Sequence, residues 1–255
     1  MISIRAKIII DPIQIELKSG LHAGAGYSRG LIDKAVMRDG RGQIYVPGSS
    51  LKGKTREACE WIASGQGIAN PDCLPPAPKG VCKKCIVCSI FGAPGGGGEL
   101  TSGLYWDNAY LTEDWQQATG KKNKKNGGQL ELSSPRTQVG ISRSRGVAQE
   151  GLLFTGEFSA EQLTFQTRVT GHLTLTPVAE EKGRYYELIL LVSGLKLVTA
   201  LGGNTSRGAG LCEIKLPKQV VIQSSEYSQE ELDVDFLINR LDLLSLYNDE
   251  VEAAQ

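Results

Sequence analysis

The stretch SIRAKIIIDPIQIEL, residues 3–17, decides the first element of the fold. Isoleucine occupies positions 4, 8, 10, 13 and 15, and polar or charged residues stand between most of them. Alternation of this kind is typical of a β-strand with one face against a core and the other in water. We therefore predict a half-buried first strand that is broken near Asp11-Pro12.

A helix is predicted in residues 49–65, SSLKGKTREACEWIASG. Serine is suited to capping the free backbone N–H groups of a first helical turn, and Gly65 is suited to ending the helix. The apolar positions of the segment share one helical face and are Leu51, Ala58, Trp61 and Ile62. The cap is expected at Ser49 or Ser50.

The rest of the chain contains mostly strand-like segments. Three are predicted single strands: residues 100–112, 168–178 and 211–216. Residues 136–158 alternate around Gly146 as a hairpin does. The apolar run of residues 185–201 is either a buried strand or a strand that leads into a helix. Many strands and few helices in non-uniform order favour an α+β fold over a doubly wound parallel sheet.

The net charge of zero conceals an uneven distribution. The chain has 28 basic and 28 acidic residues, but residues 226–255 hold nine of the acidic residues and one of the basic residues. Residues 1–225 therefore carry 27 basic and 19 acidic residues, a net charge of +8. A cationic body with an acidic tail is compatible with a polyanionic partner.

Length and hydropathy limit the class of protein. A chain of 255 residues is long enough for one large domain or two small ones with a substantial core. Its apolar runs stay below the roughly 18 residues that span a bilayer, and the N-terminus lacks the pattern of a secretion signal. We expect a cytoplasmic protein without a membrane partner.

Four of the six cysteines crowd into sixteen residues: Cys73, Cys82, Cys85 and Cys88. In a cytosolic chain such a cluster indicates a metal site before it indicates disulfides. Four thiolates complete a closed tetrahedral zinc site, and the surrounding segment has too little apolar content to fold alone. We predict a structural Zn²⁺ ion, with an iron–sulfur cluster as the alternative. Cys59 and Cys212 are expected to be buried as small apolar side chains.

The octapeptide GSSLKGKT, residues 48–55, matches the phosphate-binding P-loop pattern G-x-x-x-x-G-K-[ST]. A P-loop follows a buried parallel strand and works with an acidic residue on another strand. Here the preceding apolar run is only residues 44–46, and the longer apolar runs lack a suitable acid at their ends. A helix start still favours an anion, because its first N–H groups are unpaired. A solvated cationic helix start and a bound phosphodiester backbone both remain open, and nucleotide hydrolysis is least favoured.

A second glycine-rich loop, LGGNTSRGAG at residues 201–210, supplies four glycines and Arg207. Glycine lets a ligand approach the backbone closely, and arginine can bind phosphate through two N–H groups at once. The predicted hairpin carries Arg136, Arg143 and Arg145, whose planar guanidinium groups can stack on single-stranded bases. Together these features favour RNA binding over a nucleotide pocket.

Six motifs occur in an order that resembles the RAMP superfamily, and within it the backbone subunit of type III CRISPR effector complexes. They are GLHAGAG (20–26), GLIDKAVMRD (30–39), YVPGSSLKGKTRE (45–57), SIFGAP (89–94), RTQVGISRSRGVAQEGLLF (136–154) and LGGNTSRGAG (201–210). Each motif is short, but the ordered set covers about residues 3–216.

The resemblance implies an RRM-like (ferredoxin-like) palm with a hairpin thumb and a zinc-binding insertion. One domain would span residues 1–218, with insertions at residues 66–99 and 120–165, the second beginning with a disordered cationic loop at 120–129. An acidic tail with leucine at helical spacing would occupy residues 219–255. Such subunits stack along a guide CRISPR RNA, and each thumb displaces one base of the guide–target duplex. The implied partners are guide RNA, target RNA and other subunits of the complex, including neighbouring RAMP subunits.

The resemblance also assigns residues to RNA. Those that would hold guide phosphates are Ser49, Ser50, Lys52, Lys54, Arg56, Gly202, Gly203, Ser206, Arg207 and Gly208. Arg136, Arg143 and Arg145 would lie on the thumb. His22 would pack near the first glycine loop or contact RNA.

In catalytic members of the family, an aspartate in the loop after GLH cleaves target RNA beside each displaced base, and the matching residue here is Asp33. A carboxylate beside a splayed phosphodiester can orient the 2′-hydroxyl for in-line attack and help to hold Mg²⁺ or Mn²⁺. The resemblance thus implies a metal-dependent endoribonuclease that acts within the assembled complex. The alternative is a non-catalytic, architectural subunit in which Asp33 pairs with Lys34 or Arg38.

Overall fold

The computed structural model describes residues 3–74, 80–82, 84–93, 102–120, 132–179, 181–224 and 229–249. The predicted cationic loop lies outside this part of the chain, except for its first residue, Gly120. The same holds for the glycine-rich stretch that follows Ala93.

The first strand, β1 (Ile4–Leu17), is the longest of the described strands and is continuous through Asp11-Pro12, where a shift of register replaces the predicted break. Its buried side chains are Ala6, Ile8, Ile10, Ile13, Ile15 and Leu17. Against the neighbouring strand β7 (Thr164–Leu175), Ile10 pairs with Val169 and Ile13 with Thr167, so β1 has one extra residue at this point. This β-bulge moves the buried set from even to odd positions and keeps it on one face.

β1 and β7 are central strands of an eight-stranded sheet whose strands pair antiparallel. The path runs β10-β9-β1-β7-β4-β2, while β3 pairs with β7 and β8 pairs with β1. The remaining bounds are β2 (Tyr45–Val46), β3 (Leu104–Trp106), β4 (Ala109–Leu111), β8 (Cys212–Lys215), β9 (Gln219–Gln223) and β10 (Glu230–Asp233). The predicted strand at 100–112 is thus two short strands. A mixed α+β architecture with a large antiparallel sheet is confirmed.

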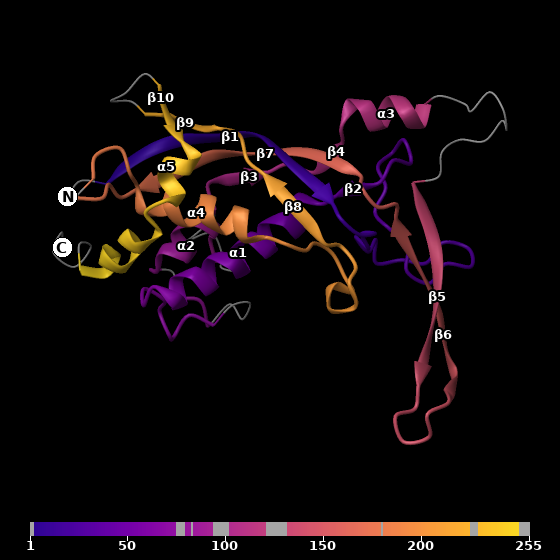
Figure 1. The fold of residues 1–255 in the computed structure, drawn as a ribbon. Helices are drawn as coiled ribbons and strands as arrows, with labels where there is room; N and C mark the ends of the chain where they lie inside the picture. Colours follow the sequence, from indigo (N-terminus) through magenta and orange to yellow (C-terminus); the bar gives the residue numbers. More distant parts are fainter. Residues whose placement is uncertain are drawn as a thin grey trace.

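Three helices cover one face of this sheet: α1 (Gly48–Gly65), α2 (Ile86–Phe91) and α4 (Tyr186–Leu197) (Figure 1). The prediction of a strand within residues 185–201 is wrong, because α4 occupies most of that run. Every residue from Tyr186 to Leu195 is buried, so α4 lacks the polar face that reveals a helix by its period.

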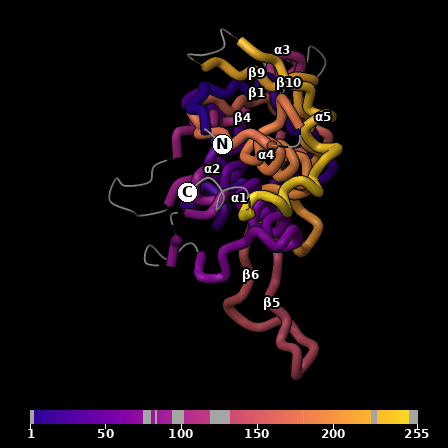
Figure 2. The backbone as a smooth tube through the Cα atoms, turned by 90° about the vertical axis from the view of Figure 1, so that its left-hand side faces the viewer, coloured from indigo at the N-terminus to yellow at the C-terminus, as the bar shows by residue number. Residues whose placement is uncertain are grey.

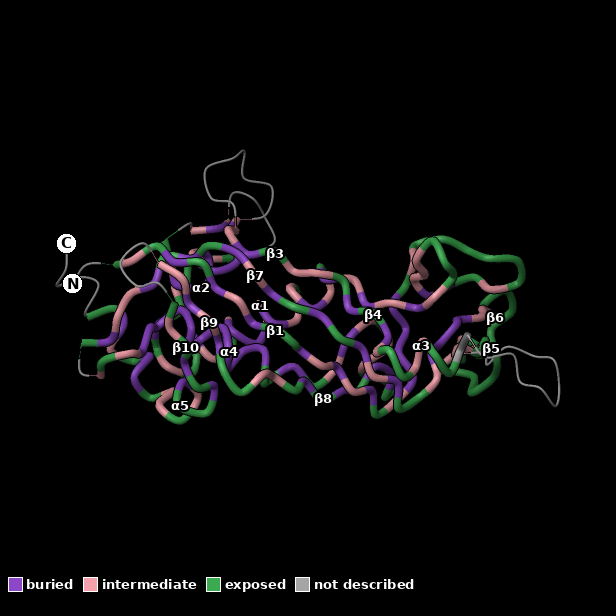
Figure 3. Tube along the Cα trace, turned by 90° about the horizontal axis from the view of Figure 1, so that it is seen from above, coloured by how far each residue is buried: buried purple, intermediate pink, exposed green. Residues whose placement is uncertain are grey.

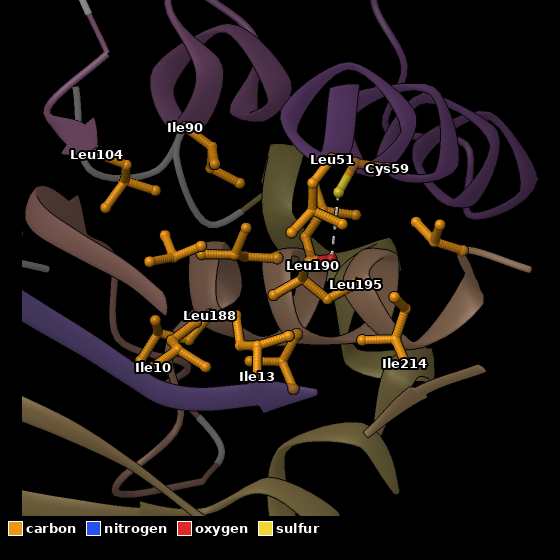
Figure 4. Close-up of a cluster of buried hydrophobic side chains, with 14 of the residues drawn as sticks. Ile10, Ile13, Leu51, Cys59, Ile90, Leu104, Leu188, Leu190, Leu195 and Ile214 are labelled. Carbon is orange, nitrogen blue, oxygen red and sulfur yellow. Dashed lines mark hydrogen bonds between the residues drawn. The ribbon is translucent and has the colours of Figure 1, made fainter. Parts of the chain in front are cut away.

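The core lies between α1, α4 and the sheet (Figure 4). Gly194 lets α4 approach α1 closely, since a Cβ atom there would lie 2.3 Å from the Cys59 sulfur. The Cys59 thiol donates a hydrogen bond to the Leu190 carbonyl across the same contact, at 3.4 Å. Burial raises the pKa of Cys59, as expected for a small apolar side chain.

The predicted hairpin is confirmed as β5 (Ser133–Ile141) and β6 (Ala148–Ser159), paired antiparallel. It projects from one end of the molecule (Figures 1 and 2). Its outer part is exposed, whereas Gly156 to Ser159 at its base are buried (Figure 3). Helix α3 (Glu113–Gly120) leads from β4 towards the hairpin end.

The acidic C-terminal segment differs from the predicted helical tail. Residues 219–223 and 230–233 are strands β9 and β10 at the edge of the main sheet, followed by α5 (Val234–Ile238) and the 3-10 helix η3 (Leu241–Leu246). Leu237, Leu243 and Leu244 are buried in the common core. The apolar centre of β9 and the mostly acidic β10 therefore pair as edge strands before the leucine spacing becomes helical. Among the described helices, none is long and apolar enough to cross a membrane.

Candidate RNA-binding and metal sites

A groove of about 390 Å³ lies where three segments of distant sequence meet. The start of α1 contributes Pro47, Ser49, Ser50, Gly53, Lys54 and Glu57, the segment after β1 contributes His22, Ala23 and Gly24, and the second glycine loop contributes Gly202 and Gly203. Six of the residues predicted to bind RNA are thus brought together: His22, Ser49, Ser50, Lys54, Gly202 and Gly203.

The N-terminus of α1 forms one wall of the groove. Pro47 is the N-cap residue and makes no side-chain cap, so the predicted cap at Ser49 or Ser50 is wrong; both serines lie in the first turn. The Gly48 N–H donates to Asn108 Oδ1 at 2.9 Å, and the first turn contains no acidic residue. The positive end of the helix dipole is therefore not neutralised by an acidic residue in its own first turn, and the Glu57 carboxylate in the groove pairs with Lys54.

The glycine loop is joined to His22 through the backbone. The Gly203 N–H donates to the His22 carbonyl at 2.9 Å. Gly202 has φ +78°, and a Cβ atom there would lie 2.5 Å from the same oxygen. Both the positive φ and the close approach require glycine at position 202. The His22 ring itself is buried, with Nδ1 2.7 Å from the Glu157 carbonyl and the ring 5.4 Å from that of Phe158.

Two of the predicted phosphate-binding cations lie on another side of α1. Arg56 donates from Nε to Glu60 and from Nη1 to the Gly92 carbonyl, both at 2.9 Å, and its Nη2 is 4.0 Å from the Cys88 sulfur. Arg56 therefore faces the cysteine segment, because two of its side-chain nitrogens contact residues there and the third pairs with Glu60 on α1. Burial and the nearby Arg56 charge lower the pKa of Lys52, which shares this side. Of the three cations, only Lys54 lines the groove, where it pairs with Glu57 at 2.7 Å.

Asp33 lies at the base of the hairpin rather than in the groove. Its Oδ2 accepts a hydrogen bond from the Thr155 N–H at 2.7 Å, and the Thr155 carbonyl accepts from the Asp33 N–H at 2.9 Å. Lys34 forms a parallel β-bridge with Gly156, and its Nζ lies 5.1 Å from the centre of the Phe154 ring. The described contacts therefore connect Asp33 to β6, not to Lys34 or Arg38. Its side chain is exposed to solvent.

Glu157 is a buried acidic residue on β6 that the sequence analysis missed. Its Oε1 accepts from Ser133 Oγ at 2.6 Å and from Arg38 Nη2 at 2.5 Å, and its Oε2 accepts from the Val36 N–H at 3.0 Å. Burial opposes ionisation of Glu157, but these three donors outweigh it and lower the pKa. An acid directly before Phe158, near the end of the predicted hairpin, was the available signal.

The arginines predicted to contact RNA divide along the hairpin. Arg136 lies at the base, with its guanidinium 5.1 Å from the centre of the Phe158 ring, and Arg143 and Arg145 lie exposed near the tip. Arg207 donates to Gln138 on β5 at 3.3 Å, so the glycine loop also contacts the hairpin. Ser206, in the 3-10 helix η2 (Thr205–Arg207), and Gly208, its C-cap, are exposed.

The four clustered cysteines have the geometry of a tetrahedral metal site. Their sulfur atoms all lie within 4.8 Å of one another, with 3.5 Å between Cys73 and Cys88 and 3.9 Å between Cys73 and Cys85. Zn–S bonds of about 2.3 Å at tetrahedral angles place sulfurs about 3.8 Å apart. The spacing therefore fits one zinc ion.

Backbone N–H groups support the same assignment. Those of Cys85 and Lys84 point at the Cys82 sulfur at 3.3 and 3.5 Å. Burial opposes ionisation of Cys82, but these donors lower its pKa to about 7, whereas burial raises that of Cys85. A bound cation deprotonates coordinating thiols outright and so overrides such differences.

The fold and these sites define an α+β protein with a projecting hairpin and a groove built from glycine loops and a helix start. Residues 14–213, well over half of the chain, match the RAMP superfamily, and the chain belongs to it. The resemblance indicated by the six motifs is therefore confirmed.

Two known proteins are similar to this chain. The CRISPR system Cms endoribonuclease Csm3 of Methanocaldococcus jannaschii is 29% identical over 259 residues, which cover 94% of each chain. A chain in the cryo-EM structure of the type III-B Cmr-beta complex bound to cognate target RNA has a TM-score of 0.52 and 17% identity. That match covers 82% of this chain and 96% of the other, and concerns the fold.

Proposed function

We propose that this protein is a backbone subunit of a type III CRISPR effector complex, which binds guide RNA in the groove and cleaves target RNA through Asp33. The observation that carries the proposal is the convergence of His22, the α1 N-terminus and the second glycine loop in one groove, beside a hairpin that holds Asp33 at its base. The name of the similar archaeal protein, an endoribonuclease of a CRISPR system, supports the same activity.

We further propose that the palm is RRM-like. The order β1-α1-β3/β4-β7-α4-β8 along the chain, with β8, β1, β7 and β3 adjacent in that order, is the arrangement that a ferredoxin-like βαββαβ unit produces. Strands β9, β10 and β2 extend this unit, and the segment with the cysteines enters between α1 and β3. The hairpin β5-β6 enters between β4 and β7 and corresponds to the thumb.

Partners follow from the same assignment. The groove takes the phosphates of a guide RNA, and the exposed arginines of the hairpin face the guide–target duplex. Other subunits, including neighbouring copies of related fold, complete the complex. The cytoplasmic location remains a prediction that accompanies this role.

The proposed cleavage needs few groups from the protein. The Asp33 carboxylate, held by Thr155, either accepts the proton of the target 2′-hydroxyl or orients that hydroxyl towards the adjacent phosphorus for in-line attack. The 2′-oxygen bonds to phosphorus as the bond from phosphorus to the 5′-oxygen of the next nucleotide breaks. One product ends in a 2′,3′-cyclic phosphate, and the other has a 5′-hydroxyl whose proton comes from water. Among the described residues only the cysteines form a converging set of three or more potential metal ligands. A Mg²⁺ or Mn²⁺ ion at Asp33 would therefore complete its shell with RNA phosphates and water, and would stabilise charge on the phosphate.

The decisive variant is Asp33→Asn in the assembled complex. Asparagine keeps an oxygen that can accept the Thr155 N–H, but it loses the negative charge. We expect target cleavage at this subunit's position to fall at least about a hundredfold, with guide binding unchanged. The products are resolved on a sequencing gel, with Asp39→Asn, an acid outside the hairpin base, as the control.

Normal cutting by Asp33→Asn and by Asp33→Ala would support the second candidate, a non-catalytic architectural subunit. The Asp33–Thr155 hydrogen bond favours that candidate, because the carboxylate already has a structural partner. Nucleotide hydrolysis is no longer a candidate. The chain is helical from Gly48, so the octapeptide cannot form the loop that wraps a triphosphate, and the preceding strand β2 pairs antiparallel with β4.

We also propose that Cys73, Cys82, Cys85 and Cys88 hold a structural zinc ion. Cys85→Ser should release the metal and loosen the segment around residues 80–93, since three thiolates bind zinc much more weakly than four. Elemental analysis of the purified protein measures the ion, and Cys212→Ser, a buried cysteine in β8, is the matched control. Wild-type protein free of zinc and iron would remove this proposal.

A further inference from the structure

Residues 155–158 of β6 contact both parts of the proposed site. The backbone of Thr155 holds the Asp33 carboxylate, and the Glu157 carbonyl lies 2.7 Å from His22 Nδ1 in the groove. The Glu157 N–H also donates to the Lys34 carbonyl at 2.9 Å. This segment therefore connects the groove, the Asp33 loop and the hairpin.

The Glu157 side chain connects three separate pieces of chain. Its carboxylate joins Ser133 at the start of β5, the backbone of Val36, and the Arg38 guanidinium. Val36 and Arg38 follow Asp33 by three and five residues, so they control where the Asp33 loop lies against β6. The Arg38 Nη1 also donates to the Gly42 carbonyl at 2.9 Å, which fixes the far end of the same segment.

Burying a carboxylate costs free energy, and a connection that only holds chain segments together does not need one. Glu157 is 4% exposed, and well-packed apolar residues stabilise a core at least as well as a buried ion pair does. What the ion pair adds is a defined geometry, because each of its oxygens has fixed donors and one arrangement satisfies all of them. Geometry of this kind matters where a reacting group must be held within a fraction of an ångström.

We propose that Glu157, through its ion pair with Arg38, is the positioning residue that sets the Asp33 loop against the hairpin base. The pair keeps the Asp33 carboxylate at the target phosphate while contributing little to guide binding. This inference rests on the proposed function, because it assumes that Asp33 cleaves target RNA.

The test uses Glu157→Gln in the complex reconstituted with its guide RNA. Glutamine retains the shape and one acceptor oxygen but not the charge that holds Arg38. We expect the single-turnover cleavage rate at saturating target to fall about tenfold or more, with guide and target affinities within about twofold of wild type. Glu150→Gln, an exposed acid on the same strand, should cut at the wild-type rate.

Arg38→Gln gives an independent route to the same result, should Glu157→Gln fail to assemble. The double variant should be no slower than the slower single variant, because both substitutions remove one interaction. A merely structural role would instead lower guide affinity in step with the cleavage rate. That outcome, or failure of both variants to load guide RNA, overturns the inference.

The inference and the proposed function fail in different ways. If Asp33→Asn cuts normally, the proposed function is wrong, whatever Glu157→Gln does. If Asp33→Asn is inactive and Glu157→Gln cuts at the wild-type rate, Asp33 is catalytic and the positioning role of Glu157 is wrong.

Discussion

The palm and the hairpin are both built from antiparallel strands, but they are held in opposite ways. Along β7 every second residue is buried against the helices, whereas β6 has no buried residue before Gly156. The palm is fixed by packing over its whole length. The hairpin is held at its base by hydrogen bonds and by the buried residues Gly156 to Ser159. We therefore expect substitutions in the palm to act mainly on stability, and substitutions in the hairpin to act mainly on the geometry of the Asp33 loop.

The largest difference in stability between the two regions is expected when one leucine of each is truncated. Leu190→Ala in α4 removes a side chain that is 0% exposed and leaves a cavity beside α1, which should lower the free energy of unfolding by about 2–5 kcal/mol. Leu153→Ala on β6 truncates a side chain that is 69% exposed and should change it by less than about 0.5 kcal/mol. Urea denaturation of both variants measures the difference. Equal losses would show that the hairpin packs as the palm does.

A smaller effect is expected from Glu187, a buried acid at the start of α4. Its two oxygens accept from the Thr176 N–H and hydroxyl, at 2.7 and 2.9 Å, and Tyr247 lies near it. Burial nevertheless raises the pKa of Glu187 to about 7. The folded state thus binds a proton that the unfolded state releases above pH 4.5, and stability falls as the pH rises from 4.5 to 7 and is level above 7.

Glu187→Gln should remove this dependence, because glutamine has no proton to lose. The difference in unfolding free energy between pH 5 and pH 8 should shrink by about 2–3 kcal/mol. Urea titrations at the two pH values provide the measurement, and Glu150→Gln on the exposed hairpin should leave the difference unchanged. A variant with the wild-type pH profile would contradict the assignment.

The smallest effect is expected on the face of the palm that the helices leave open. Arg168 and Asp107 form an ion pair of 2.7 Å with both side chains about half exposed. Arg168→Ala should leave the midpoint of urea denaturation unchanged within error, because solvent screens such pairs. A clear loss of stability would show that a half-exposed side chain of the palm still contributes to its stability, so that exposure does not distinguish the two regions.

The palm was predictable where one face of an element is buried and the other is not. Alternation of apolar and polar residues predicts both strand β1 and the hairpin. The interruption of this pattern at Asp11-Pro12 coincides with the bulge. Helix α4 was predicted only in part, as one of two alternatives that both began with a strand, because burial on all sides erases the period on which such predictions depend. The placement of Trp61 on the buried face of α1 was wrong, since its side chain is 65% exposed.

Two glycine loops with nearby cations made the groove predictable. Which residues line it was not predictable. Lys52, Lys54 and Arg56 are all cations near the start of the predicted helix, and the sequence does not distinguish their roles. Arg56 nevertheless faces a cysteine segment whose position depends on the tertiary fold. The contacts of Asp33 and Glu157 with distant segments span more than a hundred residues, and a single sequence carries no record of such pairings. Motif order located the Asp33 loop, and only the fold supplied its partners.

The bulge in β1 has a consequence for how this chain can change. Removal of one residue between Ile10 and Ile13 would turn the buried side chains that follow towards solvent, and would also shift the half of the strand that pairs with β8. We expect that Asp11 and Pro12 can be replaced by other residues if the backbone path is kept. The number of residues between Ile10 and Ile13 must stay at two. Insertions and deletions are therefore expected in the cysteine segment and the hairpin, while the spacing within β1 stays constant.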